Sequence, residues 1–90
     1  MRVHGFSRPA RGYNELKREA LAIFDSHDWL RPPDWALLAR FWPPRSAYSY
    51  LKRLWFWRLL ERRRDARGLL VYRLSDRGRD RLRWLRRNSR

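Results

Sequence analysis

The sequence lacks cysteine altogether, which excludes disulfides, thiolate metal ligands and cysteine nucleophiles and is typical of a reducing cytoplasm. Its only histidines, His4 and His27, stand too far apart along the chain for a metal-binding spacing. A glycine-rich phosphate loop and a nucleophile elbow are also missing. We therefore expect no enzymatic activity, no metal site and no cofactor.

Long apolar stretches are missing too. No run of about 18 apolar residues occurs, so we expect neither a membrane-spanning helix nor a membrane partner. Arg2, Arg8 and Arg11 interrupt the start of the chain before any apolar segment, which argues against a signal peptide. The 90 residues suffice for one compact domain and little more.

Acidic residues are scarce: nine of them stand against 23 lysines and arginines, for a net charge of +14. The excess is uneven, because residues 1–44 carry seven basic and five acidic side chains, whereas residues 45–90 carry sixteen and four. Such asymmetry predicts a polyanionic partner on one side of the fold, and nucleic acid is the usual one. A basic helix lying on a membrane surface is the competing interpretation, but the basic half contains more than one predicted helix.

The chain is predicted to form one domain over residues 13–88, after a mobile basic arm at residues 1–12. Asn14 is a plausible N-cap for a first helix. Trp29-Leu30, a short apolar pair before two prolines, is a candidate for a minimal strand. Residues at helical spacing define the expected buried face of the first helix: Leu16, Ala20, Ile23, Phe24 and His27.

Proline pairs bracket a second predicted helix. Pro33 suits the first helical position, where its missing N–H costs nothing. Pro43-Pro44 is expected to stop this helix and to start the next. The residues expected in the core from this segment are Trp35, Leu38, Ala39 and Trp42.

A third helix is predicted from Pro44 to about Trp57, and it is the most informative one. Its outward face is basic, hydroxylated and aromatic, because no acidic residue occurs between Arg45 and Leu60. The residues expected to pack inward are Ala47, Leu51 and Leu54, with Tyr50 on their flank. The residues expected to point outward are Arg45, Tyr48, Ser49 and Lys52, with Arg53 at the edge.

Two β-prone runs, LLERRR and LLVYRLS, flank a loop that contains Asp65 and Gly68, and this pattern predicts a β-hairpin. Ser75 follows as the expected N-cap of a last helix. Gly78, Leu82 and Leu85 are expected on the inner face of that helix.

The stretch SAYSYLKRLWFWRLLERRRDARGLLVYRLSDRGRDRL, from Ser46 to Leu82, resembles the winged helix-turn-helix domain of the MarR, PadR and ArsR group of transcription regulators. The likeness extends over about residues 14–87. It implies a mainly α fold with a small β-hairpin wing, a recognition helix at about 44–57 and a basic wing at about 59–74. One departure is the lack of glycine after the recognition helix, where Trp57 or Arg58 stands.

The resemblance implies contacts to double-stranded DNA, with the recognition helix in the major groove. The chemistry agrees, because arginine bonds the guanine edge bidentately and hydroxyl groups bond bases or phosphates. We therefore expect a sequence-specific DNA-binding protein, a small transcriptional regulator associated with the nucleoid in the cytoplasm. The expected DNA-binding residues are Arg45, Ser46, Tyr48, Ser49, Lys52 and Arg53 on the helix and Arg62, Arg64 and Arg67 on the wing.

Two alternatives use the same fold, an RNA-binding protein and a protein-interaction module that binds a partner through exposed tryptophans. Six tryptophans are many for 90 residues, and Trp55 and Trp57 cannot both face the core from one helix. We also expect a homodimer joined through the terminal helices. Trp84 and Leu21, each off the expected core face of its helix, are the predicted interface residues.

Overall fold

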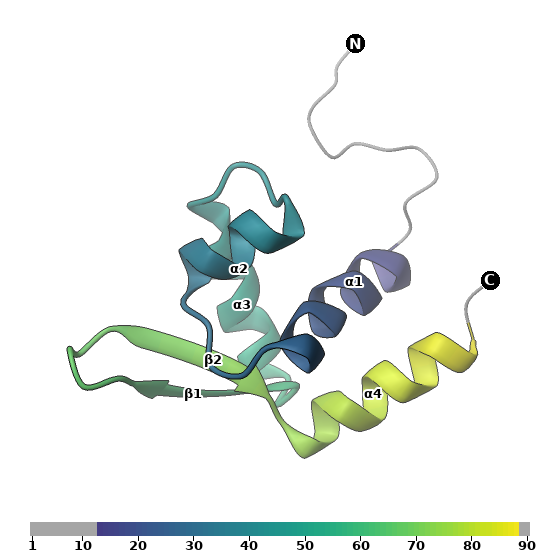
Figure 1. The fold of residues 1–90 in the computed structure, drawn as a ribbon. Coiled ribbons are helices and arrows are strands. Elements are labelled where there is room, and N and C mark those ends of the chain that lie inside the picture. The colour runs from purple at the N-terminus through teal and green to yellow at the C-terminus, as the bar shows by residue number, and fades with distance from the viewer. Residues whose placement is uncertain (1–12, 89–90) are drawn as a thin grey trace, which may run out of the picture.

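The computed structural model describes residues 13–88 as four helices and one antiparallel hairpin (Figure 1). The predicted arm at residues 1–12 lies outside the described residues. The mainly helical architecture with a small hairpin is confirmed. In chain order the elements are α1 (Tyr13–Ser26), α2 (Pro32–Ala39), α3 (Ser46–Phe56), β1 (Leu60–Arg64), β2 (Leu70–Leu74) and α4 (Asp76–Arg87).

The core lies where α1, α2 and α3 meet over the base of the hairpin. Trp35 is fully buried there, stacks beside Phe24 and Tyr50, and donates a hydrogen bond from its ring nitrogen to the Ala20 carbonyl oxygen at 3.2 Å. The predicted inward residues of α3, Ala47, Leu51 and Leu54, are all fully buried. The predicted inner face of the third helix is therefore confirmed.

The buried face of α1 differs from the predicted one. The helix begins at Tyr13, so Asn14 lies inside it and the predicted N-cap is wrong. Leu21 is 0% exposed, whereas Leu16 is only half-buried and His27 is exposed. The reason is that α1 packs against α4 as well as α2, which buries a wider face than one stripe.

Helix α2 is shorter than predicted. It begins at Pro32 and ends at Ala39, and Arg40 adopts a left-handed conformation with φ of 54°. The prolines at 43 and 44 therefore do not end it. Because α2 ends three residues before Trp42, Trp42 lies outside the helix and is 65% exposed. Leu38, in the last turn of α2, is 44% exposed, so the prediction that both residues belong to the core is wrong.

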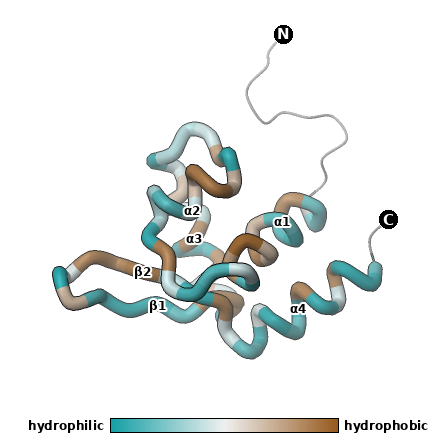
Figure 2. Tube along the Cα trace, in the orientation of Figure 1, coloured by the Kyte–Doolittle hydropathy of each residue, from teal (hydrophilic) through white to brown (hydrophobic). Residues whose placement is uncertain are grey.

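The predicted hairpin is confirmed, with Leu60 paired to Leu74 at its base and Arg64 paired to Leu70 near its tip. The predicted minimal strand also forms, because Leu30 and Tyr72 exchange two backbone hydrogen bonds of 2.8 Å each. The two strands differ in character: β2 is largely hydrophobic and β1 largely hydrophilic (Figure 2). The hairpin extends away from the helices (Figure 1).

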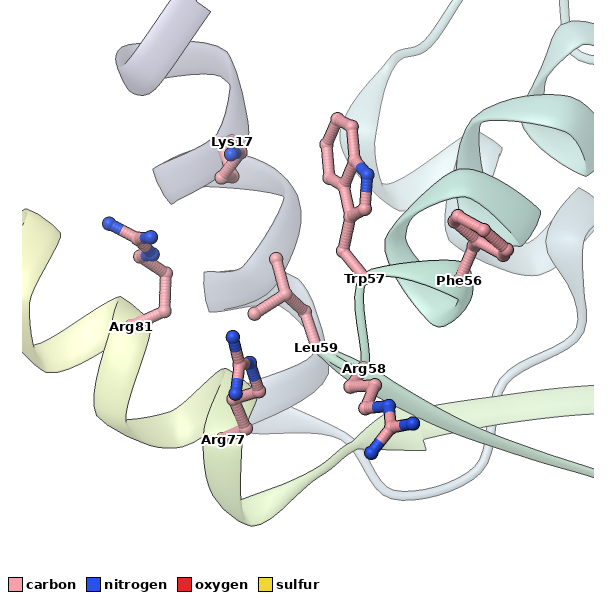
Figure 3. A pocket seen from close by; sticks show the side chains of 7 residues that line it. All are labelled: Lys17, Phe56, Trp57, Arg58, Leu59, Arg77 and Arg81. Atoms are coloured by element: carbon pink, nitrogen blue, oxygen red, sulfur yellow. The ribbon is translucent and has the colours of Figure 1, made fainter.

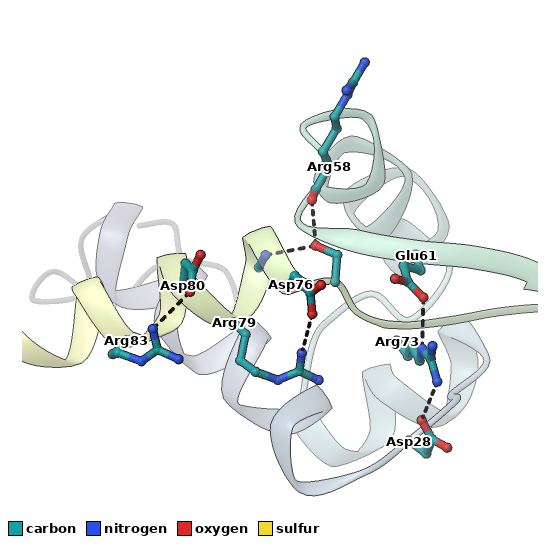
Figure 4. A network of polar contacts seen from close by, with 10 residues as sticks. Asp28, Arg58, Glu61, Arg73, Asp76, Arg79, Asp80 and Arg83 are labelled. Atoms are coloured by element: carbon teal, nitrogen blue, oxygen red, sulfur yellow. Dashed lines mark hydrogen bonds and ion pairs between the residues drawn. The ribbon is translucent and has the colours of Figure 1, made fainter.

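The junction between β2 and α4 is held by Ser75, as predicted. Its hydroxyl accepts a hydrogen bond from the Gly78 N–H at 2.9 Å and donates one to the Arg58 carbonyl oxygen at 2.7 Å (Figure 4). This capping bond satisfies one of the free N–H groups at the start of α4. Leu82 and Leu85 are buried on the inner face of α4, as expected. No helix within residues 13–88 has the combination of length and apolar character that crossing a bilayer requires.

Candidate nucleic-acid interface

The outward face of α3 presents the side chains that the sequence predicted. Arg45 immediately precedes the helix, and the five predicted DNA-binding residues within the helix are all exposed. The helix spans Ser46–Phe56, so the predicted range of 44–57 is too long by Pro44 and Arg45 at its start and by Trp57 at its end. The exposed predicted residues of α3 are Ser46, Tyr48, Ser49, Lys52 and Arg53.

A stacked pair ties the hairpin to this face. The guanidinium carbon of Arg62, on β1, lies 3.6 Å from the centre of the Trp55 ring, on α3. Tyr48 and Lys52 precede Trp55 by seven and three positions and therefore share its side of the helix. The stack thus places a hairpin arginine next to the Tyr48 and Lys52 side of α3. Sequence reasoning missed the role of Trp55, because a contact between α3 and β1 has no signature in spacing.

The other face of the hairpin carries a second stack. Arg63 and Arg73 both lie over the Trp29 ring, with guanidinium carbons 4.1 and 4.7 Å from its centre. Arg73 also forms ion pairs with Glu61 at 3.0 Å and with Asp28 at 3.7 Å (Figure 4). Carboxylates therefore balance Arg73, whereas Arg63 is held by the ring and makes no ion pair among the described residues.

The tip of the hairpin is a compact turn. The Asp65 carboxylate accepts hydrogen bonds from the Arg67 N–H at 2.8 Å and from the Leu69 N–H at 2.9 Å. Gly68 has φ of 83°, a left-handed conformation that glycine adopts without strain. Arg64 donates a hydrogen bond to the Gly68 carbonyl oxygen at 3.0 Å, and the Arg67 side chain is exposed. The turn therefore orders the backbone beneath both of these predicted wing arginines.

The turn makes the hairpin sensitive to acid. The hydrogen bond from the Leu69 N–H, and then that from Arg67, lower the pKa of Asp65 below 3.8. A carboxyl group with a lowered pKa stabilises the fold above its unfolded pKa, and this contribution is lost as the pH falls through the folded pKa. We expect the parent protein to be more stable than Asp65→Asn at pH 7, with the difference shrinking below pH 3.8. Urea unfolding of both proteins across this pH range measures the difference, and a constant gap would contradict the role given to the turn.

The end of α3 departs from the glycine-terminated pattern. Arg58 has φ of 66°, and backbone hydrogen bonds run from the Arg58 N–H to the Trp55 oxygen at 2.8 Å and from the Leu59 N–H to the Leu54 oxygen at 2.9 Å. These bonds are those of the left-handed cap in which glycine is usual. An arginine at this position carries a backbone strain of about 1–2 kcal/mol. The helix therefore ends in the expected geometry with an unexpected residue.

The two predicted dimer residues differ in their exposure. Leu21, on α1, is fully buried in the core of the domain, so its assignment to a subunit interface is wrong. Trp84 is 42% exposed on α4, and the Arg81 guanidinium lies 5.5 Å from its ring centre. Only Trp84 is available at the surface.

The described part of the chain contains no group of three histidine, aspartate or glutamate side chains that could hold a metal ion. The outward face of α3, together with Arg62 on β1, presents cations, hydroxyl groups and rings, a combination that suits the binding of a polyanion. No protein-family model, curated protein or solved structure matches this chain.

Proposed function

We propose that the protein binds double-stranded DNA as a small transcriptional regulator of winged-helix type, with α3 in the major groove and the hairpin as the wing. The observation that carries the proposal is the stack of Arg62 on Trp55, which joins the cations of the hairpin to the acid-free face of α3. The stack brings the cations of the hairpin and those of α3 onto one surface. A duplex has phosphates on both sides of the groove that a helix enters, so one such surface can contact the groove and the phosphates beside it.

The two parts of this surface have different chemical tasks in the proposal. Arg45 and Ser49 lie on the exposed side of α3 near its start, where side chains reach base edges. Arg64 and Arg67 lie at the hairpin tip and suit phosphates or a narrow minor groove. We accordingly assign sequence preference to α3 and general affinity to the hairpin.

Substitutions in α3 and in the hairpin test whether α3 sets sequence preference and the hairpin sets general affinity. Arg64→Gln with Arg67→Gln should weaken binding to all duplexes alike and reduce the slope of log affinity against log salt by about 0.9 per lost phosphate contact. Arg45→Ala or Ser49→Ala should instead change the preferred sequence, by about 1–3 kcal/mol per lost base contact. Selection from a random duplex library, followed by titrations at two salt concentrations, measures both effects.

A charge-matched control lies on α4. Arg79→Gln with Arg83→Gln removes the same two charges from side chains that pair with Asp76 and Asp80. This variant should bind duplexes nearly as the parent does. If the Arg45 and Ser49 variants select the same sequences as the parent with the same affinity, α3 does not read bases, and stronger binding to RNA than to any duplex would favour the RNA-binding alternative.

A homodimer remains part of the proposal. One short reading helix gives limited specificity, and dimers gain it by reading two half-sites about one helical turn apart. The partly exposed Trp84 on α4 supports a contact through the last helix. Leu21 has no part in it.

A second candidate function rests on a different observation. Three large apolar side chains are exposed in this part of the chain: Leu37 (80%) and Leu38 (44%) in the last turn of α2, and Trp42 (65%) three residues after the helix ends. Exposed apolar clusters mark protein-interaction sites when they are contiguous. These exposed apolar side chains favour the protein-interaction module among the alternatives. Weak duplex binding that salt abolishes, in the titrations described above, would support that alternative over DNA binding.

A further inference from the structure

A cationic cleft lies at the opposite end of α3 from Arg45. It has a volume of about 540 Å³ and lies between the end of α3, the middle of α1 and the start of α4 (Figure 3). Four basic side chains line it and no carboxylate does. These residues are Lys17, Arg58, Arg77 and Arg81.

Three of the cations belong to the two helices that border the cleft, Lys17 to α1 and Arg77 and Arg81 to α4. In Figure 3 the side chains of Lys17, Arg77 and Arg81 lie around Leu59, whereas the Arg58 side chain points away from them. Lys17 is only 9% exposed, and its ammonium nitrogen lies 4.9 Å from the centre of the Trp57 ring. The cleft thus has a positive charge on its sheltered side, where water screens charge less than at the surface.

The acidic residues of α4 pair with arginines other than Arg77 and Arg81. Asp76 pairs with Arg79 at 3.2 Å and Asp80 pairs with Arg83 at 3.0 Å (Figure 4). The pairs leave the Arg77 side chain with no hydrogen bond or ion pair among residues 13–88. Arg77 and Arg81 stand four positions apart, so they share one side of α4 and repel one another.

The backbone at the rim of the cleft is also strained. Arg58 adopts the left-handed conformation described above, although glycine would fit there without cost. Like-charge repulsion and backbone strain therefore occur at one place, where neither favours folding. Strain of this kind concentrates at functional sites, where ligand binding offsets it.

We propose that this cleft binds a small polyphosphate, such as the triphosphate group of a nucleotide. Lys17 belongs to α1 and Arg77 and Arg81 belong to α4, so a ligand with several anionic groups matches these separate cations better than a single anion does. The volume is in the range of small-ligand sites, about 300–1,000 Å³. A concave space between helices also suits a compact ligand better than the convex phosphate backbone of a duplex. The proposal is independent of DNA binding by α3.

Calorimetric titration of the full chain with tripolyphosphate, in 150 mM salt without divalent cations, tests the proposal. We expect saturable binding at one site and a rise in melting temperature. Arg77→Gln with Arg81→Gln should weaken this binding by about tenfold or more, because two charge-assisted contacts are lost. Arg79→Gln with Arg83→Gln, with the same charge and spacing on the same helix, should change it by less than about twofold.

Circular dichroism melts establish that both variants are folded, and both pairs are exposed enough for this to be expected. Equal weakening by the two pairs would overturn the proposal in favour of diffuse attraction to a protein of net charge +14. Absence of saturable tripolyphosphate binding would also overturn it. If tripolyphosphate did not bind, and Arg77→Gln with Arg81→Gln weakened duplex binding whereas Arg79→Gln with Arg83→Gln did not, the phosphates that contact the cleft would be those of DNA. Because the titration contains no DNA, failure of the proposed function leaves its result unaffected.

Discussion

Leu51→Asp is expected to unfold the protein at 25 °C. Leu51 is fully buried at the centre of α3, where the helix meets α2 and the hairpin base. Truncating a core leucine costs about 2–5 kcal/mol, and an unpaired buried carboxylate adds several more. A small domain has about 5–15 kcal/mol of stability in total. Far-ultraviolet and near-ultraviolet circular dichroism should show loss of helix and of tertiary packing.

Lys52→Asp is the matched control for this variant. It introduces the same side chain one position later, on the exposed face of α3. We expect it to melt cooperatively close to the parent temperature and, under the proposed function, to lose duplex affinity. A cooperatively folded Leu51→Asp protein would mean that α3 packs through a different face.

Gly78→Ala is expected to lower the melting temperature by roughly 10 °C or more. A Cβ atom at Gly78 would overlap the carbonyl oxygen of Leu59 and press on the Leu74 side chain at 3.1 Å. The Leu59 carbonyl cannot move freely, because it accepts a hydrogen bond from the Ser75 N–H at 3.1 Å. Alanine gains about 1 kcal/mol in helix propensity, which the overlap with backbone exceeds. Thermal melts followed by circular dichroism measure the net effect.

Gly68→Ala provides the comparison for Gly78→Ala. No heavy atom lies within 4 Å of a Cβ built at Gly68, so the only penalty there is the left-handed backbone. That penalty is about 1–2 kcal/mol, and we expect a smaller loss confined to the hairpin. A Gly78→Ala protein as stable as the parent would show that α4 can move away from the end of α3.

The elements that local sequence determines were predictable. The inward face of α3 follows from Ala47, Leu51 and Leu54 alone, because helical spacing fixes which side chains share a face. The start of α4 follows from Ser75, whose hydroxyl makes the predicted kind of capping bond. The hairpin follows from two β-prone runs around a loop with a glycine.

The wrong predictions share a cause, which is that tertiary contacts override local patterns. Nothing in the sequence marks Arg40 as a left-handed residue, so the sequence predicts that the second helix ends at the prolines, whereas α2 ends before Arg40. The main apolar stripe of the first helix does not include Leu21; α1 packs against α4, more than fifty residues away in the chain, and this contact widens the buried face of α1.

The candidate site also combines features that local sequence predicts with features that depend on tertiary contacts. The exposed cations and hydroxyl groups of α3 were predictable from periodicity. The sequence did not predict the stacks of arginine on Trp55 and Trp29, or the cleft that Lys17 shares with Arg77 and Arg81, because each joins segments that approach only in the folded chain. Composition indicated an excess of positive charge, but only the fold places it.

The stacked arginines have a consequence for the entropy of association. A freely rotating arginine side chain has about 2 kcal/mol of rotamer entropy to lose when a partner immobilises it. Arg62 and Arg63 lie over tryptophan rings, with guanidinium carbons 3.6 and 4.1 Å from the ring centres, so much of this freedom is already lost in the folded protein. In the proposed complex these two side chains are already ordered before they contact phosphates, which raises affinity without any additional contact. Lysine at these positions would keep the charge but lose this preorganisation, because a compact ammonium group has no planar face to lie flat on a ring.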